Sequence, residues 1–184
     1  IQLTIDNLNS KYLPDLKNEK KIKYQENLKT ILKQIKQIEN LVNEFSDFAR
    51  MPKPLIKNND LIKVLDENIE LLKKIDSSIN FTVNNRTGKK VLINFDNEQF
   101  NRLFFNLIKN SIESIMEKAK KTNKSLKNID IEINQRRDYI TVNVTDTGEG
   151  FKDKKTKDII KPYYTTKEKG TGLGLSIVDK IIND

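Results

Sequence analysis

The feature that most constrains the fold is a run of apolar side chains between residues 28 and 49, spaced alternately by three and four residues. This spacing predicts an α-helix whose apolar stripe has the a/d pattern of a coiled coil, with Lys, Gln, Glu and Asn between the stripe positions. The stripe comprises Leu28, Ile31, Ile35, Ile38, Val42, Phe45 and Ala49, and Leu32, Leu41 and Phe48 widen it.

A shorter upstream helix is predicted by the apolar residues Ile1, Ile5, Leu8 and Tyr12. The pattern is then interrupted by Pro14, Asp15 and Asn18. Two such helices alone would leave much of the stripe in water, so we expect the hairpin to dimerise into a four-helix bundle. The alternative is an antiparallel helix pair packed on the downstream part of the chain.

The best domain boundary is Met51-Pro52-Lys53-Pro54, because proline cannot continue a helical hydrogen-bond ladder. The sequence therefore predicts a helical hairpin over residues 1–51, a stiff hinge over 52–59 and a second domain over 60–184. A length of 184 residues suits such a division. Because the chain begins with Ile1 and ends inside a helical pattern, we expect it to be a fragment of a longer protein.

The second domain alternates predicted helices and strands. Asp60 is placed to cap one helix and Asp96 a longer one, whose apolar face runs from Phe100 to Ile115. Strands are predicted over 81–83, 91–95, 129–134 and 139–145, the last two forming a hairpin around 136–138. A short helix near 155–160 and a closing helix from 173 complete the pattern. This order predicts an α+β fold, a two-layer α/β sandwich with a largely antiparallel sheet.

Composition excludes several kinds of chemistry. The sequence has no cysteine and no histidine, so disulfides, thiolate metal sites, an imidazole base and phosphohistidine within this chain are ruled out. No apolar run approaches the roughly 18 residues of a membrane span. The formal charge of +8 is spread along the chain, with small lysine clusters at 17–23 and 118–127. We interpret most lysines as solvated, with partner binding and nucleic-acid binding as the alternatives, and expect no nucleic-acid partner.

Three polar residues of the long helix are candidates for binding a metal ion. Asn106 and Asn110 are four residues apart and Glu113 follows one turn later, so all three lie on one helix face. Carboxamide and carboxylate oxygens are the hard ligands that Mg²⁺ prefers beside phosphates. The alternative is that these residues are simply the solvated side of the helix.

Three further segments stand out in the last 40 residues. Asp146-Thr-Gly-Glu-Gly150 follows a strand, and its glycines let the backbone approach a ligand while a carboxylate accepts a hydrogen bond from an amine. The segment 161–167, Lys-Pro-Tyr-Tyr-Thr-Thr-Lys, offers hydroxyls and a lysine that can hold phosphate. The segment 170–175, Gly-Thr-Gly-Leu-Gly-Leu, opens the final helix, where backbone N–H groups form a natural anion site. Each segment alone is weak, and an ordinary turn or surface loop is the alternative.

Together and in this order, the four segments resemble the N, G1, F and G2 boxes of the Bergerat-type ATP-binding fold. Histidine kinases, type II topoisomerases, MutL and Hsp90 share this fold. The ATP-hydrolysing relatives carry glutamate, as general base, where this sequence has Asn106, which cannot abstract a proton. Asparagine at this position resembles the pattern of the histidine kinases, in which the phosphoryl group goes to a protein side chain and not to water. The segment 41–54 and the Tyr-Tyr-Thr-Thr-Lys sequence are similar to the NtrY-like branch, and this resemblance covers essentially the whole chain.

The resemblance implies a role for each site residue. Asn110 would ligate Mg²⁺, Asn106 would support phosphates or metal, and Lys167 would approach the terminal phosphate of ATP. Residues 151–169 would form a mobile lid. The remaining residues implied to contact the nucleotide are Glu113, Asp146, Gly148, Gly150, Thr166, Gly170, Gly172, Leu173 and Gly174.

The resemblance also implies the biology of the longer protein. It would be a protein-histidine kinase that passes phosphate from ATP to a histidine upstream of Ile1, and then to an aspartate of a response regulator that resembles NtrX. Homodimers would form through the hairpin, and the chain would be the cytoplasmic part of a membrane-anchored sensor. This fragment itself is not expected to autophosphorylate. The alternatives are a Bergerat-fold ATPase and a non-catalytic dimeric scaffold.

The sequence departs from the family pattern in two places. Lys161 stands where an acidic residue is common, and Ile160 replaces an aromatic residue. Family members also continue into two closing strands after the last helix. We therefore expect an exposed sheet edge in this chain.

Overall fold

The computed structural model describes residues 2–12, 18–88, 90–122, 125–151, 156–167 and 170–183. The chain divides into two compact units, residues 1–50 and 51–184. Ile1, Pro14, Asp15 and Lys155, which the sequence analysis used, lie outside the described residues.

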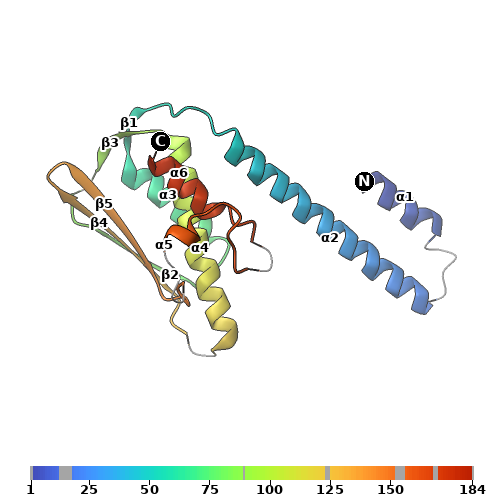
Figure 1. Cartoon of the computed structure of the whole chain (residues 1–184). Coiled ribbons are helices and arrows are strands. Elements are labelled where there is room, and N and C mark those ends of the chain that lie inside the picture. Colours follow the sequence, from blue (N-terminus) through green and yellow to red (C-terminus); the bar gives the residue numbers. More distant parts are fainter. Residues whose placement is uncertain are drawn as a thin grey trace. The chain divides into compact units, whose positions relative to one another are not determined.

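The first unit contains two helices, α1 (Gln2–Tyr12) and α2 (Asn18–Ala49) (Figure 1). Asn18, expected to interrupt the helical pattern, is instead the first residue of α2. Ile5 and Leu28 are buried, but most of the apolar stripe of α2 is exposed, with Ile38 63% and Val42 52% accessible. The predicted heptad helix is confirmed, and α1 covers little of its apolar stripe.

The second unit begins with a strand that the sequence analysis missed. This strand, β1 (Lys57–Asp60), pairs antiparallel with β3 (Leu92–Phe95) in a separate two-stranded sheet. Its sequence, Lys-Asn-Asn-Asp, has none of the apolar or β-branched residues that mark a strand. Pairing with β3 therefore determines its conformation.

Two aspartates begin the main helices, as predicted. Asp60 caps α3 (Leu61–Lys73), where its side chain accepts a hydrogen bond from the N–H of Ile62. Asp96 caps α4 (Asn97–Lys121) by accepting from the N–H of Gln99 at 2.9 Å. Each carboxylate satisfies a backbone donor that has no partner inside the helix.

The main sheet has the order β2-β4-β5. β4 (Asn128–Arg136) and β5 (Tyr139–Asp146) form the predicted antiparallel hairpin, with Arg137 at a φ of 49° in its turn. β2 (Asn80–Asn85) pairs with β4 in parallel, because β3 and α4 lie between them in the chain and return it in the same direction. The β4–β5 and β1–β3 pairs are antiparallel, so the predicted largely antiparallel pairing is confirmed, with β2–β4 as the exception. β5 is an edge strand of this sheet.

Helices α3, α4 and α6 (Gly174–Asn183) lie together on one side of the three-stranded sheet (Figure 1). The buried face of β4 consists of Ile129, Ile131 and Ile133, each at most 1% exposed. On the helical side, Leu65, Ile108 and Ile115 are completely buried. This two-layer α/β arrangement confirms the predicted fold class. A short helix, α5 (Thr156–Ile159), precedes α6.

No described helix is long and apolar enough to cross a membrane.

Candidate functional site

Helix α4 is the platform of the candidate site, because all four sequence segments contact it or belong to it. Its buried side, including Leu103, Ile108 and Ile112, anchors it against α3, α6 and the sheet. Asn106, Asn110 and Glu113 are half-buried on this helix. Packing on one side thus fixes the direction in which the polar residues are presented.

The start of α6 lies directly over the two asparagines. A Cβ atom on Gly174 would lie 3.2 Å from Oδ1 of Asn106 and 3.5 Å from Nδ2 of Asn110. Asn106 also donates from Nδ2 to the carbonyl of Arg102 at 2.8 Å, which orients its amide. Glycine at position 174 therefore allows the helix N-terminus to lie close to both carboxamides.

Lys167 reaches the same place from the loop before α6. Its ammonium forms an ion pair with Glu113 and donates a hydrogen bond to Oδ1 of Asn110 at 3.4 Å. The Lys167 side chain is 25% exposed, so the pair is only partly screened by water. Three of the residues singled out from sequence are thus in contact, although Lys167 is separated from Glu113 by 54 positions.

The loop that carries Lys167 is shaped by a threonine and two glycines. The hydroxyl of Thr165 accepts from the N–H of Lys167 at 3.1 Å, and the N–H of Gly170 donates to the carbonyl of Lys167 at 3.2 Å. Gly172 has a φ of 71°, and a Cβ there would lie 2.5 Å from the carbonyl carbon of Tyr163. Both its conformation and its surroundings therefore require glycine.

The two other site residues predicted in this region, Thr166 and Leu173, differ in their exposure to solvent. Thr166 is exposed. Leu173 is completely buried, and its carbonyl accepts from the hydroxyl of Ser176 at 2.8 Å. The predicted lid, residues 151–169, includes 152–155 and 168–169, which lie outside the described residues.

The aspartate turn lies further along α4. Oδ1 of Asp146 accepts from the N–H of Gly148 at 2.8 Å, which closes a tight turn at the end of β5. A Cβ on Gly148 would lie 2.1 Å from Oγ of Ser114, so here glycine is required by close packing on the helix. Gly150 has a φ of 66° with open space around it, and is required only by its conformation.

Two further residues, which the sequence patterns did not single out, hold this turn. Oγ of Ser114 accepts from the N–H of Glu149 at 3.1 Å. The ammonium of Lys118 donates to the carbonyls of Thr147 and Gly148, at 2.7 and 3.3 Å. Their spacing of four places them on one face of α4, but nothing in the sequence indicates that this face meets the turn.

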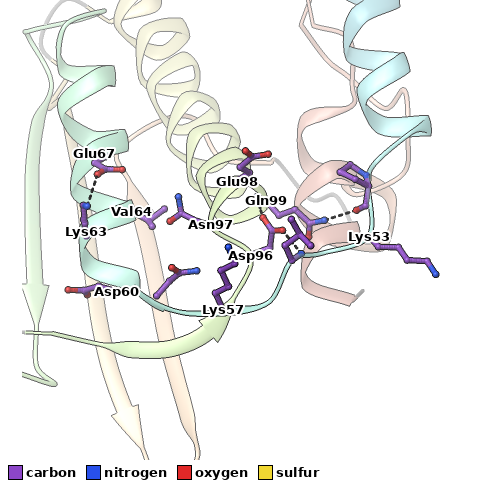
Figure 2. Close-up of a pocket in the computed structure, with 13 residues that line it drawn as sticks. Lys53, Lys57, Asp60, Lys63, Val64, Glu67, Asp96, Asn97, Glu98 and Gln99 are labelled. Atoms are coloured by element: carbon purple, nitrogen blue, oxygen red, sulfur yellow. Dashed lines mark hydrogen bonds and ion pairs between the residues drawn. The ribbon is translucent and has the colours of Figure 1, made fainter.

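A cavity of 490 Å³ lies elsewhere in the second unit (Figure 2). It is lined by the segment 52–57, at the start of this unit, and by the first turns of α3 and α4. Gln99 donates from Nε2 to the carbonyl of Pro52, and Asp96 accepts from the N–H of Leu55. Burial raises the pKa of Asp96, but hydrogen bonds from the backbone N–H groups of Gln99, Leu55 and Glu98 outweigh it and hold that pKa below its usual value. These contacts hold the segment 52–57 against α4 and do not involve the predicted site residues.

Comparison with known proteins places these features in a family. Residues 95–184 match the family described as histidine kinase-, DNA gyrase B-, and HSP90-like ATPase. The whole chain is 29% identical to the nitrogen regulation protein NtrY of Azorhizobium caulinodans and 31% identical to a putative NtrY-like sensor histidine kinase of Rickettsia bellii. It spans only 23% and 29% of the lengths of these two relatives. Sporulation kinase C of Bacillus subtilis is 32% identical over 84% of this chain and 35% of its own length.

Solved structures of histidine kinases have a similar fold. The catalytic domain of histidine kinase ThkA superimposes with a TM-score of 0.59 at 25% identity, covering 70% of this chain and 81% of that one. Full-length ShkA in complex with AMPPNP gives a TM-score of 0.65 at 18% identity, covering 85% of this chain and 33% of that one. The second similarity concerns the fold alone.

Proposed function

Because this chain belongs to the sensor histidine kinases of the NtrY-like type, we propose that its second unit binds Mg²⁺–ATP along helix α4 and acts as the catalytic part of a protein-histidine kinase. The γ-phosphoryl group passes to a histidine outside these 184 residues, which contain none. From there it passes to an aspartate of an NtrX-like response regulator. The longer protein dimerises through the α1–α2 hairpin and is anchored in the membrane, with this portion in the cytoplasm.

The observation that carries the proposal is the convergence of distant segments on one helix. Lys167 contacts Asn110 and Glu113, Gly174 packs on Asn106 and Asn110, and the aspartate turn packs on Ser114 and Lys118. A site for the phosphates and a site for the base thus follow one another along α4. Such a separation is what a nucleotide requires, since its charged and aromatic ends need different partners.

In this proposal the base lies at Asp146. One carboxylate oxygen holds the N–H of Gly148, and the other accepts a hydrogen bond from the exocyclic amine of adenine. Gly148 and Gly150 form the adjoining wall. An acceptor at this position favours adenine over guanine, whose carbonyl at the equivalent position offers no donor.

The phosphates lie between Lys167 and the start of α6. The N–H groups of Gly172 and Gly174 lie just before and at the first residue of this ten-residue helix, whose dipole favours negative charge there. The N–H of Gly170, which donates to the carbonyl of Lys167, shapes the loop that leads to them. Lys167 now neutralises Glu113, and it exchanges this partner for the terminal phosphate when ATP is bound.

The oxygen donors on α4 fit a magnesium ion. Asn106, Asn110 and Glu113 provide hard oxygens at one place, with Asn110 as the proposed direct ligand. Bound Mg²⁺ would neutralise charge that develops on the phosphate oxygens during transfer.

The chain itself contributes positioning rather than proton transfer. Asn106 has no basic atom that can activate water, so its amide can only orient the phosphates or their ligands. The unprotonated nitrogen of the accepting imidazole attacks the γ-phosphorus, the bond to the bridging β-phosphate oxygen breaks and ADP leaves. The proton on the other ring nitrogen passes to water. Holding ATP in line for that attack is the main source of rate enhancement.

Calorimetric titration with ADP and with a non-hydrolysable ATP analogue, each with Mg²⁺, tests the nucleotide site. Asp146→Asn should abolish measurable binding, whereas Asp138→Asn, in the exposed hairpin turn, should bind as the wild type does. A folded wild-type chain that binds neither nucleotide refutes the proposal. If such a chain still dimerises, a non-catalytic scaffold becomes the better description.

Labelling with ATP tests the proposed reaction. The chain alone should acquire no phosphate, whereas a longer subunit that contains the upstream histidine should be labelled when this chain supplies the ATP site. Steady release of inorganic phosphate that depends on Asn106 would instead indicate an ATPase.

A further inference from the structure

The turn after β5 consists of two peptide groups that are each held at both ends. A trans peptide directs the C=O of one residue and the N–H of the next to opposite sides of one rigid plane. In the Thr147–Gly148 peptide, the C=O accepts from Lys118 at 2.7 Å and the N–H donates to Asp146 at 2.8 Å. Lys118 and Asp146 therefore hold the two ends of a single plane.

The next peptide is held in a similar way. The C=O of Gly148 accepts from Lys118 at 3.3 Å, and the N–H of Glu149 donates to Oγ of Ser114 at 3.1 Å. One ammonium, which has three donors, thus serves two successive carbonyls. The two helix residues determine the orientation of both planes, and with them the direction of the Gly148 N–H.

The strands restrain the turn from the opposite side. Oγ1 of Thr147 accepts from the N–H of Asn128 at 3.0 Å and donates to the carbonyl of Leu126 at 2.6 Å. The N–H of Thr147 donates to the carbonyl of Asn128 at 3.2 Å. Because Thr147 is fixed to β4, the peptide that follows it has few remaining ways to rotate, and Lys118 selects one of them.

We propose that Lys118 is a positioning residue for recognition of the nucleotide base. It orients the Thr147–Gly148 peptide, whose N–H in turn fixes Oδ1 of Asp146 and leaves Oδ2 directed at the base. Ser114 completes the arrangement through Glu149. This inference rests on the proposed function, in which Asp146 accepts the adenine amine. Lys118 itself touches no part of the nucleotide.

A purely structural role for Lys118 makes a different prediction. A lysine in the last turn of a helix also stabilises the helix dipole, and its loss would then weaken binding of every nucleotide alike. Loss of positioning at Asp146 would weaken only the contact with the amine. The ratio of affinities for a nucleotide with the amine and one without it separates these roles.

The experiment compares ADP with inosine diphosphate, which has a carbonyl in place of the amine. Affinities are measured by calorimetry for the wild-type chain, Lys118→Met, Lys118→Arg and Lys120→Met. Lys120 is an exposed lysine in the same last turn of helix α4 and serves as the control. Lys118→Met should lose about 10-fold in affinity for ADP, the size of one hydrogen bond to a charged group, and little for inosine diphosphate. Lys118→Arg should recover most of the preference, and Lys120→Met should match the wild type.

Several outcomes would overturn this inference. An unchanged ADP preference in Lys118→Met shows that Lys118 does not position Asp146, and an equal loss for both nucleotides assigns it a structural role. If the wild type binds ADP but Asp146→Asn also leaves the preference intact, the base site itself is misplaced and the proposed function fails with it.

A measurement without nucleotide keeps the inference testable if Lys118→Met binds nothing. Amide hydrogen exchange should become faster at Gly148 and Glu149 in Lys118→Met, while amides of the β4–β5 ladder keep the wild-type rate. Unchanged exchange at these two amides overturns the inference. Faster exchange throughout the unit, indicating loss of folding, overturns it equally.

Discussion

Two glycines of the same turn are required for different physical reasons, which gives a sharp test of the packing. A methyl group on Gly148 would lie 2.1 Å from Oγ and 2.7 Å from Cβ of Ser114, and 2.7 Å from Oδ1 of Asp146. A methyl group on Gly150 would meet nothing within 4 Å, but it would stand on a backbone with a φ of 66°. Gly148→Ala therefore introduces a clash, and Gly150→Ala introduces backbone strain.

The expected costs are similar in size. Normal carbon contacts lie at about 3.5–4 Å, so the alanine at 148 must push the turn from α4 by about 1 Å, which costs about 1–3 kcal/mol. The left-handed conformation at 150 costs an alanine about 1–2 kcal/mol. Single substitutions therefore do not separate the two causes.

Combination with Ser114→Gly separates them. Removing the serine side chain costs about 0.5 kcal/mol of helix propensity, together with the hydrogen bond to Glu149, in both backgrounds. It also removes two of the three atoms against which the new methyl group at 148 would clash and leaves only Oδ1 of Asp146. We expect a favourable coupling of about 1–2 kcal/mol between Gly148→Ala and Ser114→Gly. Between Gly150→Ala and Ser114→Gly the coupling should be within about 0.5 kcal/mol of zero.

Urea unfolding followed by circular dichroism measures these free energies, provided that the dependence on urea is the same for all variants. Gly148→Ala should also lose ADP affinity, because the displaced turn carries the carboxylate of Asp146. Zero coupling with Ser114→Gly would show that the turn does not pack on α4 as described. It would also remove the structural basis for the role proposed for Lys118.

Three further perturbations have defined outcomes. Lys167→Ala should lower affinity for the ATP analogue about 10-fold but that for ADP much less, while Lys161→Ala, in the exposed part of the loop, should change neither by calorimetry. Asp96→Ala should lower the free energy of unfolding by about 1–2 kcal/mol at pH 7. Since the folded-state pKa of Asp96 lies below the usual 3.8, that difference should persist at all pH values above 3.8 and shrink as the pH falls through the folded pKa, which urea titrations at several pH values would reveal. Ile38→Glu should shift light-scattering mass toward the monomer because it places a charge on the exposed apolar stripe, whereas Gln37→Glu should not.

Most of the helices and strands could be predicted because their signals are local. The heptad spacing of α2, the caps at Asp60 and Asp96, and the alternation along β4 and β5 depend on neighbours within one turn or one strand. β1 could not be predicted, since Lys57–Asp60 becomes a strand only by pairing with β3. The parallel register of β2 on β4 likewise joins residues about 48 positions apart, such as Asn80 and Asn128.

The candidate site shows the same division. Helical periodicity alone places Asn106, Asn110 and Glu113 on one face, and local backbone requirements mark the glycine-rich loops. Three other features of the site are contacts between separate elements. Lys167 pairs with Glu113, Gly174 lies close to the two asparagines, and Lys118 donates hydrogen bonds to the aspartate turn. By itself the sequence determined which groups the protein has and how they are spaced along each helix and strand. Only the tertiary structure decided which of them meet, because those contacts depend on how buried apolar faces bring separate elements together.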